Sequence, residues 1–214
     1  MLTGVTAEAL RRIASARSLL RVAQALEGKD DTSRSAKGLL FVHNYAIYEY
    51  VVVESVRALV GKLNSCGLPF AATRAELLAM ALDPEFMSII KGAPAKTWAN
   101  RAELLRKVRS ATAVAISEGL FPKDGTQFRP SQLETIWNIF GLPGSIVPDP
   151  RLRGHITEMV DSRNKIAHGE DAPYVVGGRF TVGELEKRIN DTEVVCTHII
   201  TSVASYATEA NAFQ

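Results

Sequence analysis

The chain has 214 residues, of which 46% are hydrophobic and 22% are charged, proportions typical of a globular protein rather than a disordered or fibrous one. Its net charge of +2 permits an RNA partner but falls short of the strong basicity of a protein that coats duplexes. Two isolated cysteines and four scattered histidines argue against a structural zinc site and require no oxidising compartment. The chain shows no signal-peptide pattern and no apolar run long enough to span a bilayer, so we expect a cytoplasmic protein without a membrane partner.

The first predicted helix covers residues 6–27, where apolar residues recur at helical spacing. Its polar side carries the densest positive cluster in the sequence, formed by Arg11, Arg12, Arg17 and Arg21. A solvated surface is the simplest interpretation of this cluster, and an RNA-contacting face is the alternative. The polar residues 28–35 are expected to form a loop.

The second predicted helix covers residues 36–63 and is apolar on almost every side, which indicates burial. The run from Val51 to Val53 favours a strand, but the helical pattern continues on both sides and burial overrides so weak a propensity. Glu49 lies inside this apolar helix, where a carboxylate needs a partner. Arg163 is the expected partner, in either a structural ion pair or a functional site.

Further helices are predicted at residues 73–82, 84–91, 97–118, 131–141, 151–168 and 181–210. Capping boxes, in which a serine or threonine precedes a glutamate by three positions, predict three of these helix starts, at Thr73, Ser131 and Thr181. The segment 121–130 is expected to be a loop, 142–150 a proline-rich connector, and 172–180 a small hairpin or a loop.

These patterns predict an all-α fold, in which four long helices form a bundle. The region of about 64–130 would add shorter helices at one side, and the whole chain, 1–214, would form one domain. Trp98 and Trp137 lie on different predicted helices and are both expected in the core.

The stretch that ends the helix at 151–168 contains Arg163, Asn164 and His168, followed by Gly169. Arg163 projects into the apolar stripe of this helix, and a buried guanidinium needs a partner. A fixed cation, an amide and an imidazole that titrates near neutrality together suit phosphate chemistry. The simpler alternative is that His168 caps the last carbonyls of its helix and Arg163 forms a structural ion pair.

Common catalytic and nucleotide-binding motifs are missing from the sequence. No GxxxxGK[ST], GxGxxG, GxSxG or HExxH pattern occurs, so a phosphate-binding loop, a dinucleotide site, a hydrolase elbow and a zinc protease site have no support. We therefore expect no metal and no cofactor.

The segment Arg163-Asn-Lys-Ile-Ala-His168-Gly resembles the R-x4-H motif of the HEPN superfamily. The helix around Tyr45-x-x-Tyr48-Glu49 is similar to the tyrosine-plus-acid helix of HEPN nucleases from prokaryotic toxin and defence systems, and residues 131–141 resemble the short helix that precedes their motif helix. The resemblance covers most of the chain and implies a HEPN-like helical bundle.

The resemblance also implies a metal-independent endoribonuclease that works as a homodimer, with the motifs of two chains facing one cleft. His168 would act as general base or acid on the ribose 2′-hydroxyl and the leaving group. Arg163 would stabilise the charge of the transition state, and Asn164 would hold phosphate or fix the imidazole. Glu49 would orient Arg163 or His168 from the facing helix.

Substrate contacts are expected from Tyr45, Tyr48 and Lys165, with RNA as the substrate. Some HEPN toxins carry a tyrosine two residues after the motif histidine, where this chain has Glu170, so modification or antitoxin behaviour tied to that tyrosine does not carry over. The resulting hypothesis is an RNA-cleaving enzyme of a toxin–antitoxin or antiviral system, with an antitoxin or defence protein as a possible partner. The alternatives are a non-catalytic HEPN module that binds RNA, nucleotide or a protein, and a purely structural bundle.

Overall fold

The computed structural model describes residues 2–27, 30–119, 127–209 and 213, and these are helical without a single strand, as predicted. The α-helices are α1 (Thr3–Ala25), α2 (Asp30–Ser65), α3 (Ala75–Ala81), α4 (Asp83–Lys91), α5 (Thr97–Val108), α6 (Pro130–Phe140), α7 (Leu152–Ala167), α8 (Pro173–Gly177) and α9 (Val182–Tyr206). Two short 3-10 turns, η1 (Phe70–Ala72) and η2 (Pro94–Lys96), lie between them. None of the helices in this part of the chain is long and apolar enough to cross a bilayer.

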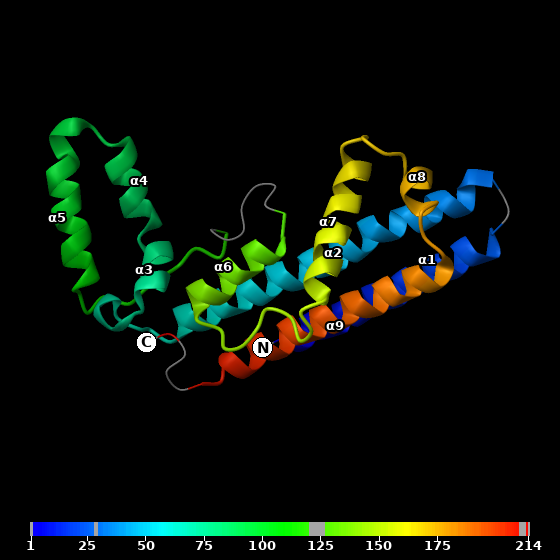
Figure 1. Ribbon diagram of the computed structural model, residues 1–214. Coiled ribbons are helices and arrows are strands. Elements are labelled where there is room, and N and C mark those ends of the chain that lie inside the picture. Colours follow the sequence, from blue (N-terminus) through cyan, green and yellow to red (C-terminus); the bar gives the residue numbers. More distant parts are fainter. Residues whose placement is uncertain (1, 28–29, 120–126, 210–212, 214) are drawn as a thin grey trace.

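Helix α2 is the centre of the molecule. It lies alongside α1 and α9, while α7 and α8 pack on it from a second side (Figure 1). Its buried side chains point in every direction, as the all-round apolar pattern predicted, and include Leu40, Phe41, Ile47, Val51, Val52, Val56, Leu59 and Leu63. The valine run is helical because the surrounding helices bury it on several sides.

Helix α2 begins earlier than predicted, because residues 30–35 are helical instead of forming a loop. The buried hydroxyl of Ser33 donates a hydrogen bond of 2.7 Å to the carbonyl of Ala23 in α1. This contact fixes the first turn of α2 against the end of α1, and it satisfies a polar side chain that the sequence pattern assigned to solvent.

Helix α8 occupies the segment predicted as a hairpin or a loop, and it lies directly against α2. Two glycines make this close approach possible. A Cβ atom at Gly38 would lie 2.0 Å from the carbonyl oxygen of Pro173, and one at Gly177 would lie 2.0 Å from that of Arg34. The chain that follows α7 is therefore held on α2 by contacts that only glycine allows.

The region between α2 and α6 departs from the prediction at the end of α5. This helix stops at Val108, ten residues before the expected end, and an extended segment follows. Val114 and Ile116 are buried while the residues between and beside them are exposed, the period of two typical of extended chain. The side chain of Asn64 accepts from the amide of Ile116 and donates to its carbonyl, both at 2.9 Å, which fixes this segment beside the end of α2.

Only one of the three predicted capping boxes forms. Thr181 accepts from the amide of Glu184, whose carboxylate accepts from the Thr181 amide at 2.8 Å. Thr73 lies two residues before α3 begins, and its hydroxyl instead donates to the carbonyl of Pro69. Ser131 lies inside α6, because Pro130 occupies the first helical turn, where its missing N–H is no loss. Gly141 ends α6 with φ +67°, as expected.

Helices α4 and α5 form a hairpin that stands apart from the long helices, and we call residues 83–109 the arm (Figure 1). Neither helix contains a buried residue. Trp98 was predicted to lie in the core, but on the arm it is 77% exposed, whereas Trp137 is buried as expected. The start of α5 was predicted correctly, but no other element covers this helix on the side of Trp98.

Candidate functional site

The motif stretch lies at the C-terminal end of α7, where the backbone closes the helix by itself. The carbonyls of Asn164, Lys165 and Ile166 accept from the amides of residues 168–171 at 2.9–3.2 Å. Gly169 makes this turn with φ +72°. The side chain of His168 is exposed and forms no hydrogen bond within the described structure, so it does not cap the helix. Its imidazole is free to act on a ligand.

Arg163 projects from α7 toward α2, and its neighbours are neutral. Its Cζ atom lies 4.8 Å from the centre of the Tyr45 ring, and its Nη1 donates to Asn164 Oδ1 at 3.0 Å. The predicted ion pair with Glu49 is not formed, nor does any other described carboxylate pair with Arg163. A guanidinium that is not paired with a carboxylate can pair with an anionic ligand, and its planar donors suit phosphate.

Tyr45 lies between the two charged groups that were expected to meet. Its hydroxyl donates to Glu49 Oε1 at 3.3 Å, while its ring face supports Arg163. Burial, and then the Glu49 carboxylate, raise the pKa of Tyr45, so the hydroxyl remains a donor at neutral pH. Glu49 and Arg163 therefore both contact Tyr45 but form no ion pair with each other.

The assignment of Tyr45 and Tyr48 to substrate binding is corrected by their burial. Their side chains are 2% and 0% exposed, because both point inward from α2. Tyr48 donates to the carbonyl of Phe128 at 3.0 Å and meets the Phe128 ring edge-on. These tyrosines support the site from within the core. Lys165, the third residue assigned to substrate, is exposed within the motif, and its role stays a prediction.

Sequence reasoning missed a residue that contacts the motif directly. Gln127 precedes α6, and its Oε1 accepts a hydrogen bond of 2.7 Å from Asn164 Nδ2. This bond leaves Asn164 Oδ1 directed at Arg163, because the amide nitrogen is already engaged. A continuous set of contacts thus runs from Gln127 through Asn164 and Arg163 to the ring of Tyr45.

The two residues after Gln127 fix the same segment to α2 and α7. The Phe128 side chain is buried and its carbonyl accepts from Tyr48, while Arg129 Nη2 lies 2.6 Å from Asp161 Oδ1 on α7. The segment 121–130 was expected to be a loop, and its first six residues fall outside the described part of the chain. The sequence gives one sign that this segment packs against the core, namely the apolar Phe128 between Gln127 and Arg129.

The arrangement places an exposed imidazole four residues after an amide and five residues after a guanidinium, and these two groups are half-buried and held in position. His, Cys, Asp and Glu side chains of the described residues do not gather in groups of three or more that could hold a metal ion. What the site offers is a fixed cation, an orienting amide and an exposed imidazole.

Comparison with known proteins identifies the family. A family model described as "-like HEPN" matches residues 6–211, which is nearly the whole chain and includes every residue of the site. No curated protein and no solved structure matches the chain. Since the match extends over both the tyrosine-bearing α2 and the motif helix α7, the chain belongs to the HEPN family.

Proposed function

We propose that this HEPN protein is a metal-independent endoribonuclease that cleaves RNA through the ribose 2′-hydroxyl. The observation that carries the proposal is the environment of Arg163, a half-buried cation with only neutral partners, five residues before the exposed His168. A guanidinium held this way in a purely structural bundle would cost stability and gain no ion pair. An anionic ligand supplies the missing partner.

The reaction that fits these groups is an internal transesterification. One imidazole accepts the proton of the 2′-hydroxyl, and the 2′-oxygen attacks the neighbouring phosphorus atom. The bond from phosphorus to the 5′-oxygen breaks, and that oxygen takes a proton from a second acid. The products are a 2′,3′-cyclic phosphate and a 5′-hydroxyl, so that DNA, which lacks the attacking group, is not a substrate.

Each group at the site receives a role from its position. His168 exchanges the proton, and Arg163 stabilises the charge that grows on the phosphoryl oxygens. Asn164 holds Arg163 in place through the contact with its Oδ1. Lys165 attracts the phosphate backbone, and Glu49 orients the ring of Tyr45.

The reaction needs a base and an acid, and each chain carries one motif histidine. We propose that two copies of the chain face each other, so that the two His168 imidazoles supply both functions in one cleft. The biological setting that we propose is a toxin–antitoxin or antiviral system, in which a partner protein restrains the cleavage of RNA.

The test is cleavage of end-labelled single-stranded RNA in EDTA by the wild type, His168→Ala and Arg163→Ala. We expect cutting by the wild type, loss of cutting in both variants, and unchanged melting temperatures. His198→Ala is the matched control, since His198 contacts the carbonyl of Ser145, far from the motif in sequence. Equal cutting by the wild type and His168→Ala would refute the proposal. Tight RNA binding without any cutting would indicate the non-catalytic HEPN module instead.

A further inference from the structure

The basic excess of the protein is concentrated on the arm. Residues 83–109 contain six of the 25 lysines and arginines but only three of the 23 acidic residues. The arm therefore has a formal charge of +3, while the remainder of the chain has one more acidic than basic residue. By net charge, the arm therefore attracts an anionic ligand more strongly than the remainder of the chain does.

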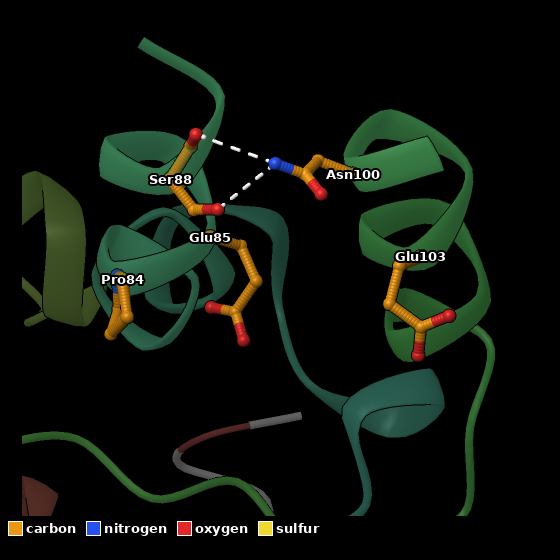
Figure 2. A pocket seen from close by; sticks show the side chains of 5 residues that line it. All are labelled: Pro84, Glu85, Ser88, Asn100 and Glu103. Atoms are coloured by element: carbon orange, nitrogen blue, oxygen red, sulfur yellow. Dashed lines mark hydrogen bonds between the residues drawn. The ribbon is translucent and has the colours of Figure 1, made fainter. Parts of the chain in front are cut away.

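Two of the three acidic residues of the arm form ion pairs with its own cations. Glu85 pairs with Lys107, and Glu103 pairs with Arg106. Figure 2 shows both carboxylates beside a hollow of about 200 Å³ between α4 and α5, where Asn100 donates to Ser88. Pairing across and along the two helices neutralises these carboxylates and leaves the outer side of the arm basic.

The outer cations make no ion pairs within the described structure, and they are Lys91, Lys96, Arg101 and Arg109. The other basic cluster of the chain, on α1, differs in this respect. Arg11 and Arg12 both contact Glu8, and Arg17 contacts Glu193 of α9. Three of the four arginines of α1 are therefore neutralised, whereas four of the six cations of the arm form no ion pair within the described residues.

An aromatic ring lies among these free cations. Trp98 is 77% exposed, and the Cζ atom of Arg101 lies 5.0 Å from its ring centre. Leu105 follows on the same face of α5, seven positions after Trp98, and is 63% exposed. No packing in the fold requires these apolar groups, because α5 has no buried residue. Exposed tryptophan with a neighbouring arginine is the composition on which unpaired bases stack.

We propose that the face of the arm formed by Trp98, Arg101 and Leu105 of α5, with Arg109 directly after that helix, binds single-stranded RNA. Trp98 stacks on a base through the ring area not covered by Arg101, and the cations contact the neighbouring phosphates. The proposal rests on the proposed function in taking RNA as the substrate. Figure 1 shows the arm and the C-terminal end of α7 projecting from the same side of the long helices, so one strand bound by the arm can extend toward the motif.

A second copy of the chain is the competing occupant, since Phe86, Met87 and Ile90 on α4 are also exposed. Charge argues against it, because two arms of +3 repel each other at close approach. A polyanion is attracted by the positive charge of the arm. RNA is such a polyanion, and its bases can also stack on the tryptophan ring.

The experiment measures binding of a fluorescein-labelled single-stranded RNA to full-length His168→Ala protein, so that cleavage does not interfere. Adding Trp98→Ala should raise Kd about 5- to 150-fold, the range for loss of one base stack. Trp98→Phe should recover part of the affinity, and Arg101→Ala should lower the salt slope of log K by about 0.7. Arg21→Ala on α1 is the matched control, an exposed arginine without an ion pair in the described structure, and should leave Kd within about twofold.

Unchanged RNA affinity in Trp98→Ala overturns the proposal. So does a lower sedimentation mass of Trp98→Ala with unchanged RNA affinity, which would assign the face to a second copy. The outcome is independent of catalysis. If the wild type binds RNA through Trp98 but does not cut it, the nuclease proposal fails and the arm remains an RNA-binding site. If the protein cuts RNA and its RNA affinity does not depend on Trp98, the arm proposal fails and the nuclease proposal stands.

Discussion

Replacement of Tyr45 tests whether Arg163 is supported by the aromatic ring, as the contact of 4.8 Å indicates. In Tyr45→Leu the cation loses a half-desolvated aromatic partner, a contact worth about 0.5–2 kcal/mol. If Arg163 then samples positions away from the phosphate, kcat/KM for RNA falls by about 2- to 30-fold. In Tyr45→Phe the ring remains and only the hydrogen bond to Glu49 is lost, so kcat/KM should stay within about twofold.

The assay is single-turnover cleavage of a labelled RNA, normalised to the folded fraction at the assay temperature. Normalisation is needed because Tyr45 is 2% exposed and its truncation leaves a cavity that lowers the free energy of unfolding. Cleavage by Tyr45→Leu at the wild-type rate would refute the role of the ring. Equal losses in the leucine and phenylalanine variants would transfer that role to the hydroxyl and Glu49.

Three further predictions concern the supporting structure. Gln127→Ala removes one hydrogen bond to Asn164, worth about 0.5–1.5 kcal/mol, so cleavage should fall by about 2- to 13-fold. Burial lowers the pKa of His155 to about 4, so its imidazole is neutral in the folded state at neutral pH. Its contribution to the free energy of unfolding is complete above the unfolded pKa of about 6.5 and is lost as pH falls toward 4. The expected loss is about 2 kcal/mol at pH 5. Gly38→Ala places a Cβ 2.0 Å from the Pro173 carbonyl and should destabilise the fold by about 1–3 kcal/mol.

Each of these predictions has a control and a contrary outcome. Gln132→Ala on α6 should leave cleavage unchanged, and an equal loss there would remove any special role for Gln127. In His155→Leu, the free energy of unfolding measured in urea should change less between pH 7.5 and pH 5 than in the wild type. Identical pH dependence in the two proteins would contradict a buried neutral imidazole. Gly154→Ala on α7 meets nothing within 4 Å and should not destabilise the protein, so equal effects at Gly38 and Gly154 would contradict the close approach of α8.

The sequence predicted the helices well where one apolar pattern extends over many turns, as in α2 and α9. It failed where tertiary contacts decide the local structure. Residues after Val108 alternate with a period of two because Asn64 fixes their backbone beside α2, and no local signal announces that contact. Trp98 was expected in the core because periodicity shows the side of a helix, but not whether another element covers it.

The candidate site was predicted in part, for the same reason. The resemblance to the R-x4-H motif selected Arg163 and His168, which lie within and directly after one helix. Gln127 could not be found, because its contact with Asn164 joins positions 37 residues apart. The sequence singled out Glu49 on α2, but it did not show that Glu49 and Arg163 are too far apart for an ion pair. In the structure both residues contact Tyr45 instead.

The most direct test of the central claim is the chemistry of the cut ends, identified by mass spectrometry after cleavage of RNA in EDTA. Attack by the 2′-hydroxyl predicts a 2′,3′-cyclic phosphate on one fragment and a 5′-hydroxyl on the other, and the same strand with 2′-deoxyribose at the cut site should stay intact. Fragments with 3′-hydroxyl and 5′-phosphate ends, or cleavage of the deoxy-substituted strand, would contradict the account.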